Sequence, residues 1–252
     1  MTAADCICRA ATEKLDDDDF AGALALARAG LVKHEHHAGL HQVYGLAAYH
    51  LGDAREALGG LEGASALAPL APVSQLALAD LYMGAGKRKS AAAGLSFLTE
   101  PGRCPTALLP DLARLLGKFG AYRSAFKVCR RLVWVRSWYH PAHYGMAHYL
   151  AKLNAPPARV IRHLRTAVAL APGAVPYRLA LAGALATARR PAEACAVVRS
   201  VPAGAVSCPA CLKRLLSAAE AANDGELVQR FRDRLRDVVQ HRCDAADDCF
   251  DV

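Results

Sequence analysis

Residues 38–70 read AGLHQVYGLAAYHLGDAREALGGLEGASALAPL and decide the fold. Two runs of helix-forming residues are separated by the turn at residues 51–53 (LGD), where glycine can adopt a left-handed conformation that ends a helix. Pro69 follows the second run and would stop a helix there. Small residues at Gly45 and Ala57 would let the two helices approach closely. The stretch therefore predicts a helix, a tight turn and an antiparallel helix.

The same pattern recurs along the chain with a period of 34 residues. The equivalent positions in successive copies are Gly52, Gly86 and Gly120; Ala57, Ala91 and Ala125; Gly45, Ala79, Ala113 and Ala147; and Leu51, Ala85, Phe119 and Leu153. The frame slips by one residue at the turn-like cluster 154–157, an insertion that a turn tolerates easily. A fixed period of this length is typical of repeat architectures. Repeats are expected at 4–36, 38–70, 72–104, 106–140, 141–174 and 175–206, followed by a capping helix pair at 207–241 and an acidic, cysteine-containing tail at 242–252.

These residues resemble the tetratricopeptide repeat (TPR), whose unit is a helix, a tight turn and an antiparallel helix. The resemblance implies an all-α fold, an α-solenoid in which about 13 or 14 helices stack as antiparallel pairs into a right-handed superhelix. It covers nearly the whole chain and predicts a single solenoid over residues 1–241. The abundance of Ala and Leu, with few aromatic residues, also favours helices. The function that the resemblance implies is a protein–protein interaction adaptor or scaffold.

In TPR proteins the first helix of each pair lines a concave groove, and its exposed side chains usually contact the partner. The positions that the repeat frame assigns to this groove are Gln42, Tyr49, His50, Asp80, Arg114, Lys118, Tyr144, His148 and Lys152. Basic and aromatic residues dominate the middle of this set, so the expected partner is an acidic or amphipathic segment of another protein. A subset of the family clamps the carboxylate of chaperone tails with asparagines. Leu46 and Asp80 stand at those positions here, so the sequence argues against that ligand.

The charge distribution supports a second hypothesis. The net charge is +8, and residues 21–242 carry 29 bases against 13 acids, a surplus of 16. A nucleic-acid-associated repeat protein is therefore the alternative function. Residues 127–140 combine Lys127, Arg130, Arg131 and Arg136 with Trp134, Trp138 and Tyr139. Helical spacing favours packing of the tryptophans between repeats with the arginines on the convex surface, and a partner surface is the other interpretation.

Two groups of residues suggest metal or redox chemistry. Cys208 and Cys211 form a CxxC motif, and a zinc site there would need Cys243 and Cys249 as further ligands. A zinc- or redox-responsive regulator is thus a minor alternative, with buried or incidental thiols preferred. The histidines at 34, 36, 37 and 41 lie in a link between repeats, where capping of helix ends is preferred over metal binding.

The sequence contains no motif of a catalytic serine, a phosphate-binding loop or a dinucleotide-binding loop, so we expect no enzymatic activity and no cofactor. No stretch has the length and apolarity of a membrane span or a signal peptide, which predicts a cytoplasmic protein. Apolar residues at helical spacing predict a capping hairpin near the C-terminal end: Leu212, Leu215, Leu216, Leu227, Phe231 and Leu235. The four arginines at 230, 232, 234 and 236 are expected to lie largely toward solvent. The sequence does not name the partner.

Overall fold

The computed structural model describes residues 2–240, and this part of the chain contains fourteen α-helices, two short 3-10 helices and no strand. The expected all-α fold and the number of helices are confirmed. The chain divides into two compact units, unit 1 at Met1–Ala121 and unit 2 at Tyr122–Val252. The expectation of one solenoid over residues 1–241 stays a prediction.

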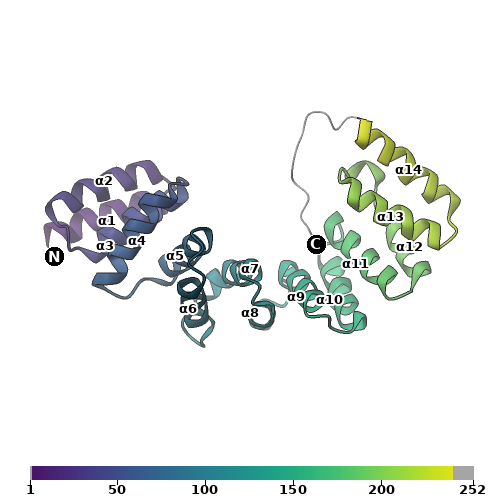
Figure 1. The fold of residues 1–252 in the computed structure, drawn as a ribbon, viewed down its shortest axis with the longest axis horizontal. Coiled ribbons are helices and arrows are strands. Elements are labelled where there is room, and N and C mark those ends of the chain that lie inside the picture. Colours follow the sequence, from purple (N-terminus) through teal and green to yellow (C-terminus); the bar gives the residue numbers. More distant parts are fainter. Residues whose placement is uncertain (1, 241–252) are drawn as a thin grey trace. The chain divides into compact units, whose positions relative to one another are not determined.

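Unit 1 is built from consecutive antiparallel helices (Figure 1). Its helices are α1 (Ala3–Asp16), α2 (Phe20–Lys33), α3 (Ala38–His50), α4 (Ala54–Leu67), α5 (Pro72–Gly84), α6 (Arg88–Thr99) and α7 (Leu109–Phe119), with a 3-10 turn at Thr106–Leu108 before α7. Four of the helices begin at a side chain that accepts a hydrogen bond from the backbone of the first turn, provided by Thr2, Asp19, His37 and Asp53. Such caps fix helix starts because the first backbone donors have no partner within the helix.

Unit 2 continues the same alternation of helix and tight turn. Its helices are α8 (Tyr122–Val135), α9 (His140–Lys152), α10 (Pro157–Leu170), α11 (Val175–Thr187), α12 (Pro191–Arg199), α13 (Pro209–Ala221) and α14 (Gly225–Gln240), with a 3-10 turn at Ala203–Ala205. Proline occupies the first turn of each helix from α9 to α13. Proline is favourable there because its missing N–H would have had no helical partner.

One turn geometry recurs at seven places within residues 2–240. The residues in the left-handed region at this turn are Asp18, Gly52, Gly86, Gly120, Asn154, Arg189 and Asn223, with φ between 52° and 90°. They lie 34 residues apart, except for the single step of 35 between Asn154 and Arg189. In each turn the next backbone N–H donates to the carbonyl five residues earlier, as from Asp53 to Ala48 and from Arg190 to Leu185. The expected left-handed cap at Gly52 is confirmed, and the 34-residue frame is a repeat of backbone geometry.

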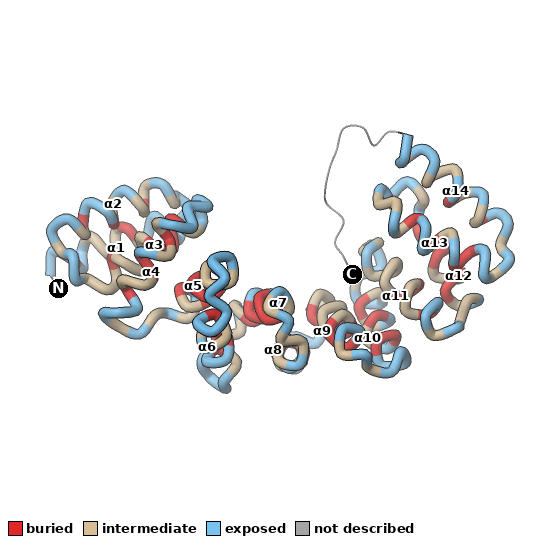
Figure 2. The backbone as a smooth tube through the Cα atoms, viewed as in Figure 1, coloured by how far each residue is buried: buried red, intermediate tan, exposed pale blue. Residues whose placement is uncertain are grey.

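Small residues allow close contact between α3 and α4. A Cβ atom added at Gly60 would lie 2.8 Å from the Cα atom of Gly45, and one added at Gly45 would lie 2.8 Å from the backbone nitrogen of Leu61. Ala57 and Ala91 are fully buried, in agreement with the proposed close helix contacts. Figure 2 shows that buried residues gather on the sides of the helices that face their neighbours.

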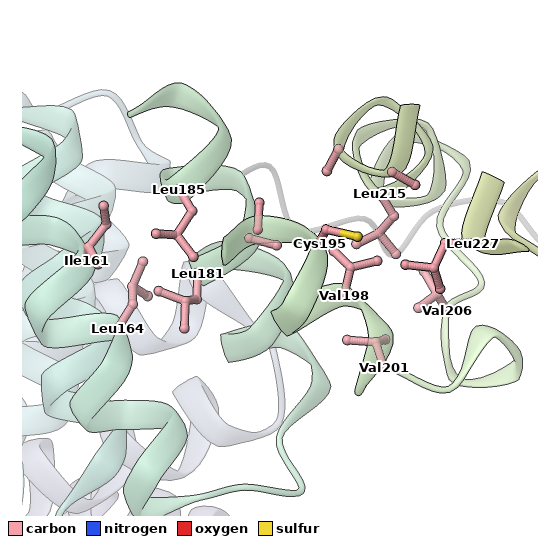
Figure 3. Close-up of a cluster of buried hydrophobic side chains, with 14 of the residues drawn as sticks. Ile161, Leu164, Leu181, Leu185, Cys195, Val198, Val201, Val206, Leu215 and Leu227 are labelled. Atoms are coloured by element: carbon pink, nitrogen blue, oxygen red, sulfur yellow. The ribbon is translucent and has the colours of Figure 1, made fainter. Parts of the chain in front are cut away.

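The core of unit 2 runs from α9 to α14. Figure 3 shows part of it, where Leu181 and Leu185 of α11 lie between Ile161 and Leu164 of α10 on one side and the later helices on the other. All six apolar residues predicted for the capping hairpin belong to this core or pack against it, which confirms that prediction.

The expectation for the four arginines of α14 is only half right. Arg232 and Arg236 are exposed, but Arg230 and Arg234 are partly buried and donate to the carbonyls of Val201 and Val206, at 3.1 and 3.2 Å. The loop at residues 201–206 has carbonyl groups outside regular structure, and the guanidinium groups satisfy them.

Candidate partner-binding faces

The predicted groove residues divide between the two units. Gln42, Tyr49, His50, Asp80, Arg114 and Lys118 lie on α3, α5 and α7 of unit 1, whereas Tyr144, His148 and Lys152 lie on α9 of unit 2. The structure brings some of these residues together within each unit, and the two faces differ in chemistry.

Three residues of unit 1 form a ladder across three successive first helices. The Tyr49 hydroxyl of α3 donates to one carboxylate oxygen of Asp80 on α5, at 2.8 Å, and Lys118 of α7 donates to the other, also at 2.8 Å. Burial raises the pKa of the Asp80 carboxyl, but the hydrogen bonds from Lys118 and Tyr49 outweigh it, so that the net shift is downward. Burial, followed by the bond to Asp80, raises the pKa of Tyr49 to about 12. Asp80 therefore stays charged and Tyr49 stays a donor at neutral pH.

The other predicted residues of unit 1 also have internal partners. Arg114 donates to Asp111 at 3.4 Å, one turn earlier on α7. Gln42 accepts from the backbone N–H of Ala71 at 3.0 Å, and the exposed His50 ring stacks on Phe20 with centroids 4.5 Å apart. The two cations of this face are thus both paired with carboxylates of the same unit, and Gln42 supports the link before α5.

On α9 of unit 2, His140, Tyr144, His148 and Lys152 form what we call the α9 row. They recur at every fourth residue, so they share one side of the helix. The Tyr144 ring stacks on Tyr177 of α11 with centroids 4.7 Å apart, and Nδ1 of His140 lies 2.8 Å from the Tyr177 hydroxyl. His140 and Tyr177 were missed in the sequence. The four-residue spacing from Tyr144 could have revealed His140, whereas nothing local marks Tyr177.

The α9 row lies in a part of the sequence that has basic but no acidic residues. Burial, followed by the nearby Lys152, lowers the pKa of His148, so that its imidazole is neutral at neutral pH. Burial also raises the pKa of Tyr144, with a smaller contribution from Tyr177. Residues 112–192 contain 14 Lys and Arg residues and no Asp or Glu. The exposed Lys152 therefore has no carboxylate from its own or the adjoining helices to pair with.

Solved structures of known proteins identify the fold. The C-terminal part of a TPR repeat-containing protein from Cytophaga hutchinsonii is similar with a TM-score of 0.71, covering 94% of this chain and 96% of that one at 11% sequence identity. A tetratricopeptide repeat protein from Parabacteroides merdae gives a TM-score of 0.61, covering 94% and 97% at 14% identity. The chain has the tetratricopeptide-repeat fold.

A third TPR structure is that of YrrB, described as having an unusual peptide-binding site. Its TM-score is 0.58, covering 68% of this chain and 88% of YrrB at 15% identity. No protein-family model and no curated protein matches the sequence. At these identities the similarity establishes the TPR fold.

Trp134 of α8 and Trp138, which follows that helix, overturn one expectation from the sequence. Trp134 has 86% and Trp138 66% of its surface exposed, so neither packs between repeats as the helical spacing suggested. The buried side of α8 consists of Ala125, Val128, Cys129 and Leu132. Trp134 follows Leu132 by two residues, which places it roughly 200° around the helix and on the opposite side. The interpretation as a partner surface is the one that this exposure favours.

The candidate metal sites have ordinary structural roles where the structure describes them. Nδ1 of His37 accepts the N–H of Leu40 at the start of α3, and Nε2 of His41 lies 2.7 Å from the Glu35 carbonyl oxygen, in agreement with capping. Cys208 caps α13, where its Sγ accepts the N–H of Cys211 at 3.4 Å. Cys243 and Cys249 lie outside the described residues. Within residues 2–240, no three His, Cys, Asp or Glu side chains group as metal ligands do, and no helix is both long and apolar enough to cross a membrane.

Proposed function

We propose that the chain is a non-catalytic scaffold that binds an acidic or amphipathic segment of a partner protein on the first helices of its TPR pairs, with the α9 row as the main contact. The observation that carries the proposal is the stacked pair Tyr144 and Tyr177 beside the exposed Lys152. Half-exposed tyrosines offer large contact area at low entropic cost, which is typical of interface anchors. The peptide-binding site described for YrrB supports the use of a TPR solenoid for such binding.

The charge of the α9 face favours an acidic segment. Because residues 112–192 contain no carboxylate, an incoming Asp or Glu would meet Lys152 without competition from the helices around it. The two cations of unit 1 are less available to a partner, since Lys118 and Arg114 already pair with Asp80 and Asp111. Their participation, and a cytoplasmic location, stay predictions.

Site-directed crosslinking tests the proposal. A photoreactive residue at position 152 is expected to capture a discrete partner segment in native cells, whereas the same residue at position 89, exposed on α6, is expected not to capture it. The captured segment is then synthesised and its affinity is measured with purified protein. We expect Tyr144→Ala and Lys152→Glu each to weaken binding about tenfold or more, and the matched change Lys89→Glu at an exposed lysine of α6 to leave the affinity unchanged. Equal affinity of all three variants would remove the α9 row from the proposal.

The unit 1 face has its own test. Arg114→Glu and Lys118→Glu together reverse both of its cations, and the affinity for the same synthetic segment is measured again. A loss as large as that of Lys152→Glu would show that the segment also occupies unit 1. No change would confine the contact to unit 2.

A further inference from the structure

The outer side of α8 carries a linear arrangement of cations that ends in an aromatic ring. Arg123, Lys127, Arg130 and Trp134, which we call the α8 stripe, are all exposed. Their spacing of four, three and four residues places them within a sector of about 60° around the helix. This sector is opposite the buried residues of α8, so the stripe is the most outward part of the helix.

Trp134 is exposed to 86%, Trp138 to 66% and the intervening Val135 to 48%. Tryptophan has the largest apolar side chain, and two rings left in water within five residues have no explanation in the packing of this unit. The Trp138 ring meets Tyr139 edge to face at 6.4 Å, which is a contact along the chain that leaves the indole accessible. An aromatic surface is therefore available directly beyond the cations.

The neighbouring helix α10 adds two more cations. The rings of Phe126 on α8 and His163 on α10 lie 6.5 Å apart, which places the two helices side by side. Arg159 and Arg162 are exposed on the outer part of α10. Among residues 2–240, no carboxylate forms an ion pair with either of them or with a cation of the α8 stripe. The positive charge of this surface is thus uncompensated.

We propose that the α8 stripe, together with Arg159 and Arg162, binds single-stranded nucleic acid. Successive cations along α8 rise by about 4.5–6 Å, comparable to the distance between phosphates of an extended strand. Guanidinium groups suit phosphate oxygens, and an exposed indole can stack on any base. This surface lies on second helices, away from the α9 row, so the inference does not depend on the proposed function.

The arrangement favours this ligand over two other polyanions. A membrane surface would require apolar side chains below the level of the charges, whereas Trp134 is in line with three cations on one helix side. An acidic peptide would form ion pairs with the cations but would make no use of the exposed indole rings. A strand of alternating phosphates and bases uses both kinds of group.

The two tryptophans are the only ones in the chain, so intrinsic tryptophan fluorescence reports this surface alone. The purified full chain is titrated with an oligouridylate of about 16 nucleotides. We expect quenching, as bases stack on the indoles, and an affinity that falls steeply with salt as counterions are released. Absence of quenching at low salt would overturn the proposal.

Charge reversal identifies the stripe. The triple variant Arg123→Glu, Lys127→Glu and Arg130→Glu is expected to make the slope of log affinity against log salt less steep by about 2. Each of the three lost phosphate contacts contributes roughly 0.7 to that slope. The matched control reverses Lys33, Arg55 and Lys89, which are exposed in unit 1 and change the net charge equally. We expect the control to keep most of the affinity. An equal loss of affinity in both triple variants would mean that only the net charge of the protein matters, and would overturn the site.

The aromatic contribution has a separate readout. Trp134→Ala is expected to weaken binding about tenfold without changing the salt slope, since stacking releases no counterions. Trp134→Phe is expected to restore part of the loss. Competition by polyglutamate of equal charge as effective as that by oligouridylate, or a blue shift with phosphatidylserine vesicles and no response to oligouridylate, would each replace nucleic acid by another ligand and overturn the proposal.

Discussion

Units 1 and 2 share one backbone repeat but differ in side-chain chemistry. The clearest comparison is between the helix pairs α3/α4 and α9/α10, which occupy the same place in the repeat frame. Their first helices are 102 residues apart and their second helices 103, because of the one-residue insertion in the turn. Gly60 of α4, pressed against Gly45, corresponds to His163 of α10, which lies among other rings. Unit 1 has 11 basic and 13 acidic residues, and unit 2 has 20 and 10. The repeat geometry therefore fixes where helices meet. The side chains at those positions differ between the units: they are small and uncharged where α3 meets α4, and polar in a basic region where α9 meets α10.

The largest expected effect concerns the core at the end of unit 2. Phe231 is fully buried on α14, and Phe231→Ala should lower the free energy of unfolding by about 3–5 kcal/mol, because it removes apolar contact and leaves a cavity. Denaturant unfolding measures the loss. The control is Val239→Ala on the same helix, where the side chain is 57% exposed and little change is expected.

Hydrogen exchange in the Phe231→Ala protein then tests whether the two units are comparable as separate bodies. We expect faster exchange in α9–α14 and unchanged protection in unit 1. Equal loss of protection in both units would show that residues 1–241 unfold as one solenoid, and the division into two units would lose its energetic meaning.

The second prediction concerns the tight contact of α3 and α4. Gly60→Ala should destabilise unit 1 by about 1–3 kcal/mol, because the new Cβ would meet the Gly45 backbone at 2.8 Å. Gly94 occupies the same repeat position in α6, but a Cβ there would lie 3.8 Å from Ala79, an ordinary contact. Gly94→Ala is expected to stabilise by about 0.5–1 kcal/mol, since alanine has the higher helix propensity. Urea midpoints that move in the same direction for both variants would contradict the assigned contacts.

The third prediction uses the turn that all pairs share. Gly86 has φ of 71°, so Gly86→Ala should cost about 1 kcal/mol, whereas Arg189 at φ 57° already carries that strain in unit 2. Arg189→Gly should therefore stabilise by about 0.5 kcal/mol, the relief being partly offset by the freer unfolded chain. Thermal melting of both variants measures the pair of effects. A destabilised Arg189→Gly would mean that the arginine side chain contributes more than its backbone conformation costs.

The fold was predictable because it depends on local backbone rules that recur. Glycine marks the left-handed turn at positions 52, 86 and 120. Asn154 and Arg189 adopt the same conformation although neither residue type requires it. The frame, and not the residue, locates the turn there. The candidate site was harder to predict. Tyr49, Asp80 and Lys118 were each expected on the groove face, yet their mutual hydrogen bonds depend on distances between helices that no spacing in the sequence encodes.

The tryptophan error has a different origin. Large apolar residues are usually buried, which favours packing for Trp134. The buried side of α8 consists of Ala125, Val128, Cys129 and Leu132, and a spacing of two residues from Leu132 places Trp134 on the opposite side of the helix. The periodicity of the sequence therefore already carried the signal against packing, and the size of the residue masked it.

The smallest expected effect is a difference in pH dependence caused by the histidines of unit 2. Burial lowers the pKa of His148, with a contribution from Lys152, and burial lowers that of His163, with contributions from Arg162, His143 and Arg159. In the unfolded chain these imidazoles titrate near their ordinary pKa of about 6.5. Between the folded and unfolded pKa values the unfolded state binds more protons. Their stabilisation is therefore complete above about pH 6.5 and is lost as pH falls through the folded pKa.

Urea unfolding at about pH 7.5 and pH 5.5, on either side of the ordinary histidine pKa, measures this loss. The wild type should be less stable at the lower pH, and His148→Gln and His163→Gln should each reduce the difference, because a neutral side chain replaces one that must be kept unprotonated. His36→Gln in unit 1 is the matched control, since its ring is 83% exposed and should leave the difference unchanged. Hydrogen exchange at the two pH values, corrected for the intrinsic rate, should assign the acid-induced loosening to α9 and α10. If α3 and α4 loosened as much, the histidine at position 163, equivalent to Gly60 in α4, would not be the origin of the difference in pH-dependent stability between the units.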